Sequence, residues 1–161
     1  MNVSRAGRRT LAGLLRALSV AGLGVFVGSM LTEGFVLVPF WRSLPASDFF
    51  TWYAANDRRL LGFFGPITAM AALLTVAAAA FSLWARESGR WFALIAAVLL
   101  VAVVLMFSLY FHQANASFAA ATIGAQDLPA ELGCWARWHW ARTALSLGAL
   151  AAALLSLRRA P

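Results

Sequence analysis

The sequence lacks lysine altogether and is poor in cysteine and in charge. Over 161 residues it has a single cysteine, Cys134, and 12% charged residues against 62% hydrophobic ones. One cysteine excludes an intramolecular disulfide. A soluble domain is only about half apolar, so the excess apolar surface of this chain must face lipid.

Several common sequence patterns are absent as well. We find no internal repeat, no heptad array and no glycine-rich phosphate loop. The net charge of +7 comes from 13 arginines, a balance that in a soluble chain indicates a nucleic-acid partner. Here the arginines fall in short connections between apolar segments. They therefore indicate orientation in a membrane, and no nucleic-acid partner is expected.

What the sequence does contain is four long apolar segments. They run roughly over Thr10–Thr32, Leu60–Trp84, Trp91–Phe111 and Trp138–Leu157. A helix of about 20 apolar residues crosses about 30 Å of hydrocarbon, and each segment reaches that length. The first lacks a small-residue cleavage site and is predicted to be a retained helix rather than a signal peptide. We predict an all-α, polytopic membrane protein: one domain over residues 1–161, forming an up-down four-helix bundle in the lipid bilayer.

The distribution of arginine predicts the orientation. On the side of both termini, Glu87 is the only acid beside eight arginines: Arg5, Arg8, Arg9, Arg16, Arg86, Arg90, Arg158 and Arg159. The connections Val38–Arg59 and His112–Arg137 carry four arginines and four acids. By the positive-inside rule both termini are cytoplasmic and these two connections lie outside. In a bacterium this describes a multi-pass inner-membrane protein with its longer loops in the periplasm.

Nearly all polar side chains able to do chemistry fall at one end of the predicted bundle. They are Glu33, Asn56, Asp57, Arg58, His112, Asn115, His139 and Arg142. Ionisable residues in or beside membrane spans are costly and tend to face the bundle interior, so they are a functional hypothesis by default. We expect these side chains to line one cavity at the periplasmic end.

The two histidines admit several interpretations. They are structural, or they form with a carboxylate the set Glu33, His112 and His139, which suits non-haem iron or copper. They could also bind a haem between them, or one of them is a general base in a metal-free site. Arg142 lies about one turn inside the fourth segment and needs an anionic partner. Glu33, Asp57 or a substrate oxyanion would serve.

Two stretches carry a family resemblance. Residues Tyr110–Phe118 (YFHQANASF) and Trp135–Leu145 (WARWHWARTAL) resemble the anthrone-oxygenase-like family of small four-span membrane proteins. That family ends its third helix with a Phe-Asn-x-Pro-x-Asn-like segment and opens its fourth with Trp-x-x-[Asn/Trp]-His-x-x-Arg-Thr. The His-x-x-Arg-Thr part fits at residues 139–143. His112 stands where the first asparagine is usual, and the proline is absent.

The resemblance implies a membrane oxidoreductase, a monooxygenase that oxidises the activated methylene of a lipophilic aromatic or quinone-like substrate with dioxygen and no added cofactor. It implies His139 as base and Arg142 as the partner of the substrate oxyanion. His112 would be a second acid/base group or a metal ligand. The side chains expected to bind the substrate are Phe111, Asn115, Trp138 and Trp140.

A second interpretation is a non-enzymatic membrane protein. It would be an accessory subunit or a metal- or haem-binding protein whose polar cluster only fastens the helix ends. A transporter is disfavoured because no acidic relay lies within the spans, Glu33 being at the end of its segment.

Overall fold

The computed structural model of the chain describes residues 5–158 as four helical runs joined by short connections. The first run joins α1 (Arg5–Thr32), a π-helical turn η1 (Glu33–Leu37) and α2 (Val38–Ser43); the second is α3 (Ala46–Trp84); the third joins α4 (Arg90–Met106), a π-helical turn η2 (Phe107–Phe111) and α5 (His112–Ala119); the fourth is α6 (Leu128–Arg158). Of the arginines that predict orientation, Arg159 and the side chains of Arg5 and Arg9 lie outside this description.

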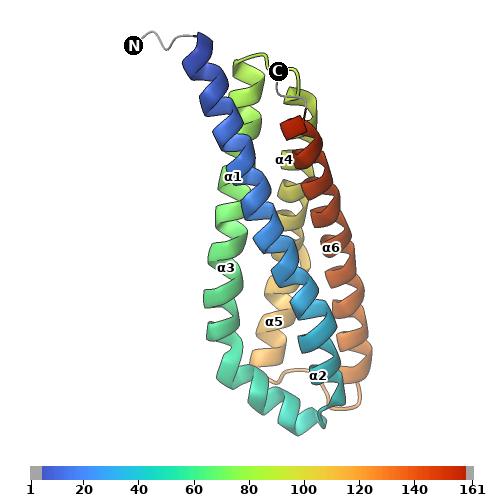
Figure 1. Ribbon diagram of the computed structural model, residues 1–161. Helices are drawn as coiled ribbons and strands as arrows, with labels where there is room; N and C mark the ends of the chain where they lie inside the picture. Colours follow the sequence, from blue (N-terminus) through green and yellow to red (C-terminus); the bar gives the residue numbers. More distant parts are fainter. Residues whose placement is uncertain (1–4, 159–161) are drawn as a thin grey trace.

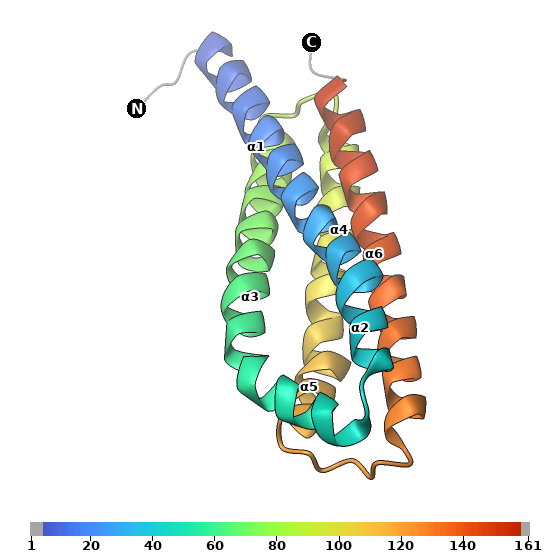
Figure 2. The ribbon, with the colours of Figure 1, turned by 60° about the horizontal axis from the view of Figure 1, so that its bottom comes forward.

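The four runs form an up-down bundle in which each helix packs on two others. α1 lies against α3 and α6, and α4 lies on the other side against the same two helices (Figure 1). The helix ends at Arg5 and Arg158 lie at one end of the bundle, which we call the proximal end. The opposite, distal end carries α2, α5 and the connection over residues 120–127 (Figure 2).

All four runs are long and apolar enough to cross a membrane, as the sequence predicts. The candidate spans are Thr10–Ser43, Ala46–Trp84, Arg90–Ala119 and Leu128–Arg158. Large apolar side chains such as Leu73 and Leu109 are about three-quarters exposed on the outside of the bundle, 73% and 76%. Such a surface needs lipid around it, so the predicted four-span membrane bundle is confirmed.

The helices are longer at the distal end than hydropathy indicates. α3 begins at Ala46 rather than near Leu60, and α6 begins at Leu128 rather than near Trp138. The predicted connections over residues 38–59 and 112–137 are therefore mostly helical, and the true distal connections span only residues 44–45 and 120–127. Hydropathy marks only the length that lies in hydrocarbon, whereas a helix continues wherever its side chains find packing partners.

An aromatic core supplies that packing. Trp41, Phe49, Phe118 and Trp135 are almost fully buried at the distal end. Trp41 lies at the centre, with ring centroids 5.3 Å from Trp135 and 5.6 Å from Tyr53. The first turns of α3 bend across this end of the bundle and cover the core (Figure 2). Packed aromatic side chains therefore close the distal end of the bundle.

Candidate functional site

Glu33, His139 and Arg142 form one buried cluster, which we call the distal triad. Arg142 Nη2 lies 2.7 Å from Glu33 Oε2 and 3.0 Å from His139 Nδ1, and that Nδ1 lies 3.4 Å from the same carboxylate oxygen. Glu33 is 5% exposed and His139 is fully buried. The structure thus brings together three of the residues singled out from the sequence, across a separation of 109 positions.

The hydrogen bonds determine the tautomer of His139. A guanidinium can only donate, so Nδ1 of the imidazole accepts from Arg142. Nε2 lies 3.0 Å from the carbonyl oxygen of Met30 and therefore carries the proton that it donates there. His139 is neutral with both ring nitrogens engaged. This geometry leaves it no free lone pair with which to act as the base that the family resemblance implies.

One face of α6 holds the imidazole in place. Trp135, His139 and Thr143 follow one another at intervals of four residues, so their side chains lie on the same side of the helix. The rings of Trp135 and His139 stack in parallel, with centroids 5.2 Å apart and planes 7° apart. Thr143 Oγ1 donates to the His139 carbonyl at 2.8 Å and lies 3.4 Å from Nε2. The spacing of four could have identified Trp135 as part of the site.

Arg142 is held between aromatic faces and a carboxylate. Its guanidinium carbon lies 3.9 Å above the centre of the Phe111 ring and 5.4 Å from that of Trp135. The Nε and Nη2 edge faces His139 and Glu33, whereas Nη1 makes no hydrogen bond to any described residue. At 12%, its side chain is the most exposed of the distal triad. Nη1 is therefore the guanidinium nitrogen that has no hydrogen-bond partner among the described residues.

The two π-helical turns lie beside the distal triad and set its geometry. In η1 the Val38 N–H bonds to the carbonyl of Glu33, five residues earlier, and η2 closes in the same way. In a regular α-helix residues five apart lie about 140° apart around the axis, but here both members of each pair are buried: Glu33 with Val38, and Met106 with Phe111. Single π-turns are rare and often mark functional sites. They place both Glu33 and Phe111 against Arg142.

Gly34 permits a close approach between η1 and α6. A Cβ at this position would lie 3.0 Å from both His139 Nε2 and Trp140 Cζ2, closer than packed atoms normally sit. Glycine thus lets the first run approach α6 without displacing the imidazole that Met30 and Glu33 contact. No sequence signal distinguishes this glycine from the others in the chain.

The structure does not bring the predicted metal set of Glu33, His112 and His139 together. His112 is exposed on α5, where its ring lies edge-on to Phe107 at 6.2 Å. Over residues 5–158 no group of three or more His, Cys, Asp or Glu side chains is placed to hold a metal ion. The extra residue in η2 brings Phe111 rather than Tyr110 to the buried position that follows Met106, and His112 stays on the exposed side.

The remaining predicted side chains divide into neighbours of the distal triad and residues apart from it. Asn115 accepts a 2.9 Å hydrogen bond from Trp135 Nε1, and the ring of Trp140 lies edge-on to His139 at 5.8 Å. Trp138 instead stacks on Tyr110, with centroids 5.0 Å apart. Asn56 donates to a backbone carbonyl of its own helix, that of Trp52.

Comparison with known proteins gives one match. A family model described as anthrone oxygenase matches residues 49–152, which is more than half of the chain. The matched range contains His139 and Arg142 and begins after Glu33. No curated protein and no solved structure matches the chain.

Proposed function

The chain belongs to the anthrone oxygenase family, and from this premise we propose that it is a membrane oxygenase for a lipophilic aromatic substrate with an activated methylene group. In the proposed reaction the CH₂ group and one O₂ give a carbonyl group and one water. One oxygen atom becomes the new carbonyl oxygen, and the other leaves as water with the two methylene hydrogens. This stoichiometry needs no further reductant.

The observation that carries the proposal is the free edge of Arg142. Removing a proton from a methylene conjugated to a carbonyl produces an enolate whose charge rests on oxygen. A fixed cation in a water-poor site stabilises such an oxyanion far better than water does. Arg142 has Nη1 unoccupied, while its other edge is fixed by Glu33 and His139. Its orientation is therefore set before a substrate arrives.

We assign proton removal to Glu33 rather than to His139. Both His139 nitrogens are engaged, whereas Glu33 uses Oε2 for its contacts with Arg142 and His139. Oε1 makes no hydrogen bond to a described residue. When Glu33 takes the proton, its carboxylate becomes neutral. The new enolate then replaces it as the negative partner of Arg142. The site keeps the same net charge throughout, which suits a low-dielectric environment. His139 is then a positioning residue.

Dioxygen uptake by the purified protein tests these assignments, with a hydroxyanthrone as the probe substrate. Glu33→Gln keeps the shape of the side chain but removes the base, and kcat should fall about 10²- to 10⁴-fold. Arg142→Lys keeps the charge but loses the fixed planar geometry, and kcat/KM should fall about 10²- to 10³-fold.

Gln113→Ala is the matched control, because Gln113 is exposed on α5 at the same end of the bundle. It should retain wild-type uptake. Full turnover by folded Glu33→Gln protein would remove Glu33 as the base, and no uptake by the wild type would remove the oxygenase proposal.

A second candidate is a non-enzymatic membrane accessory protein in which the distal triad is a structural clasp. The observation that favours it is the complete pairing of His139 in a cluster that joins α1 and η1 to α6. Under this alternative, variants of Glu33 and Arg142 would lower accumulation of the protein in the membrane. They would leave any activity of its assembly unchanged per folded molecule.

We further propose that both termini are cytoplasmic and that the distal triad lies on the outer side of a bacterial inner membrane. The support is the excess of arginine on the side of the termini. A reporter enzyme that works only in the cytoplasm should be active when fused after Pro161. Activity there of a periplasm-dependent reporter would contradict the orientation.

A further inference from the structure

Arg16, which the sequence places among the arginines that set orientation, is buried inside the bundle near its proximal end. It is 2% exposed. Its Nε donates to Ser82 Oγ of α3 at 3.1 Å, and its Nη1 donates to the Ser156 carbonyl of α6 at 3.3 Å. No salt bridge joins Arg16 to an acid within the described part of the chain. The guanidinium therefore has hydrogen bonds but no paired carboxylate, since Glu87, whose charge acts on it, forms no ion pair with it.

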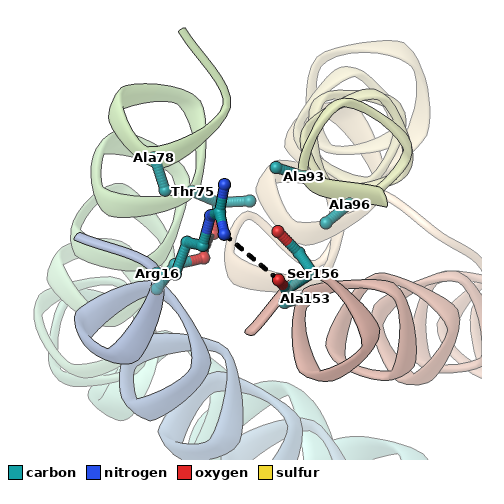
Figure 3. Close-up of a pocket in the computed structure, with 8 residues that line it drawn as sticks. Arg16, Thr75, Ala78, Ala93, Ala96, Ala153 and Ser156 are labelled. Carbon is teal, nitrogen blue, oxygen red and sulfur yellow. Dashed lines mark hydrogen bonds between the residues drawn. The ribbon is translucent and has the colours of Figure 1, made fainter. Parts of the chain in front are cut away.

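Two buried polar atoms at this position have no hydrogen-bond partner among the described residues. They are Nη2 of the Arg16 guanidinium itself and Oγ of Ser156. Both residues line a small cavity of about 10 Å³ between α1, α3, α4 and α6. Figure 3 shows the guanidinium extending from α1 into this space, with Thr75 and Ser156 beside it and alanines of α3 and α4 around it. Buried unpaired groups are rare enough that each calls for an explanation.

Of the four polar side chains that line the cavity, Ser19 already donates to Thr75, and the other three can still donate a hydrogen bond. Arg16 Nη2 carries two N–H groups, and Ser156 has a free hydroxyl. Thr75 Oγ1 accepts a 2.9 Å hydrogen bond from Ser19, which leaves its own hydrogen to point elsewhere. No carboxylate lines the space; four alanines complete its wall. Such a set of donors around a guanidinium without a paired carboxylate favours an anion.

The size of the cavity limits which anions can bind there. About 10 Å³ is close to the space that one water-sized particle needs. A phosphate, sulfate or carboxylate group does not fit between the alanines, whereas a single-atom anion does. A water molecule would satisfy the hydrogen bonds but would leave the guanidinium without an anion in contact with it.

We infer that Arg16, Thr75 and Ser156 form a binding site for a monatomic halide, such as chloride, between the proximal ends of the helices. The site is close to water, since Arg16 lies six residues, about 9 Å along the helix, from the start of its candidate span at Thr10. A bound halide would neutralise Arg16 and hold α1, α3 and α6 together.

The test is the thermal unfolding midpoint of the purified protein in a non-ionic detergent, titrated from sodium gluconate into sodium chloride or bromide at constant ionic strength. The wild type should show a saturable rise in the midpoint with either halide. Ser156→Ala removes one donor and should weaken the apparent halide affinity about five- to tenfold. Arg16→Met should abolish the halide dependence.

Arg8→Gln is the matched control. Arg8 lies at the same end, with its guanidinium carbon 5.9 Å from the Trp84 ring, and does not line the cavity. Its titration should match that of the wild type. If Arg16→Met does not accumulate, Ser156→Ala decides the question. The inference is overturned if the wild type shows no saturable halide dependence, if Ser156→Ala leaves the affinity unchanged, or if sulfate or phosphate replaces the halide.

Discussion

In the described part of the bundle, Arg16 and Arg142 are largely enclosed and join the same pair of helical runs at opposite ends, but their surroundings differ in one respect. Arg142, on α6, reaches Glu33 in the first run, so its charge is balanced by a carboxylate at 2.7 Å. Arg16, on α1, reaches the Ser156 carbonyl of α6 and has only neutral oxygens as partners. A buried ion pair is costly to break, whereas a buried charge without a partner costs stability as it stands. We therefore expect mutation of Arg142 to cost much more stability than mutation of Arg16, although both arginines link the same two runs.

The largest effect should follow from breaking the balanced pair. Glu33→Ala strands the guanidinium of Arg142 among Phe111 and Trp135, and we expect a loss of about 3–5 kcal/mol of stability. The measurement is the yield of monodisperse protein from membranes together with its thermal unfolding midpoint. The double variant Glu33→Leu/Arg142→Met removes both charges and should restore most of the stability but no activity. Failure of the double variant to recover would show that the pair is not the main contribution of these residues.

A smaller effect should follow from separating the helices that carry the pair. Gly34→Ala places a methyl group 3.0 Å from His139 Nε2 and should cost about 1–3 kcal/mol, since the backbone of η1 must move away from α6. The unfolding midpoint and dioxygen uptake should fall together. Gly28→Ala is the control, six residues earlier on the same run. A Cβ added at Gly28 would meet no other atom within 4 Å. It should be neutral or slightly stabilising.

Removing the unbalanced arginine should cost less than removing the balanced one. Arg16→Met loses two hydrogen bonds but also a buried charge, and in halide-free solution we expect its stability to lie within about 1 kcal/mol of the wild type. Arg142→Met, with Glu33 left unpaired, should lose several times more. Equal losses for the two variants would mean that Arg16 has a permanent countercharge.

The smallest effect is expected at His112. Its side chain is exposed and outside the distal triad, so His112→Asn should change stability by less than about 0.5 kcal/mol and kcat/KM by less than about twofold. Steady-state uptake kinetics check this. A large loss of turnover would place the histidine in the site despite its position on α5.

The fold was largely predictable, because hydropathy over some 20 residues is a strong signal and the ionisable residues at the span ends were few. Glu33, His139 and Arg142 could be grouped because an up-down bundle brings those ends together. The length of α3 and α6 beyond the hydrocarbon was not predictable, since it depends on packing around Trp41 that involves two other runs. The facing of residues near His112 was not predictable either: a π-turn leaves no mark in composition, yet it makes Phe111 rather than Tyr110 the residue that faces inward.

The π-turns also determine how the chain would respond to a change in length. Each of η1 and η2 holds one residue more than an α-helical turn would need between the same two buried positions. An in-frame deletion of one codon from η1, between Glu33 and Val38, would leave an unbroken α-helix in which these two positions are four residues apart, about 40° around the axis. They would stay on one face, and Trp41 would keep its place in the aromatic core. Within this family, an alignment gap of one residue at η1 or η2 would consequently mark a relative with a regular α-helical turn at that point and the same buried face.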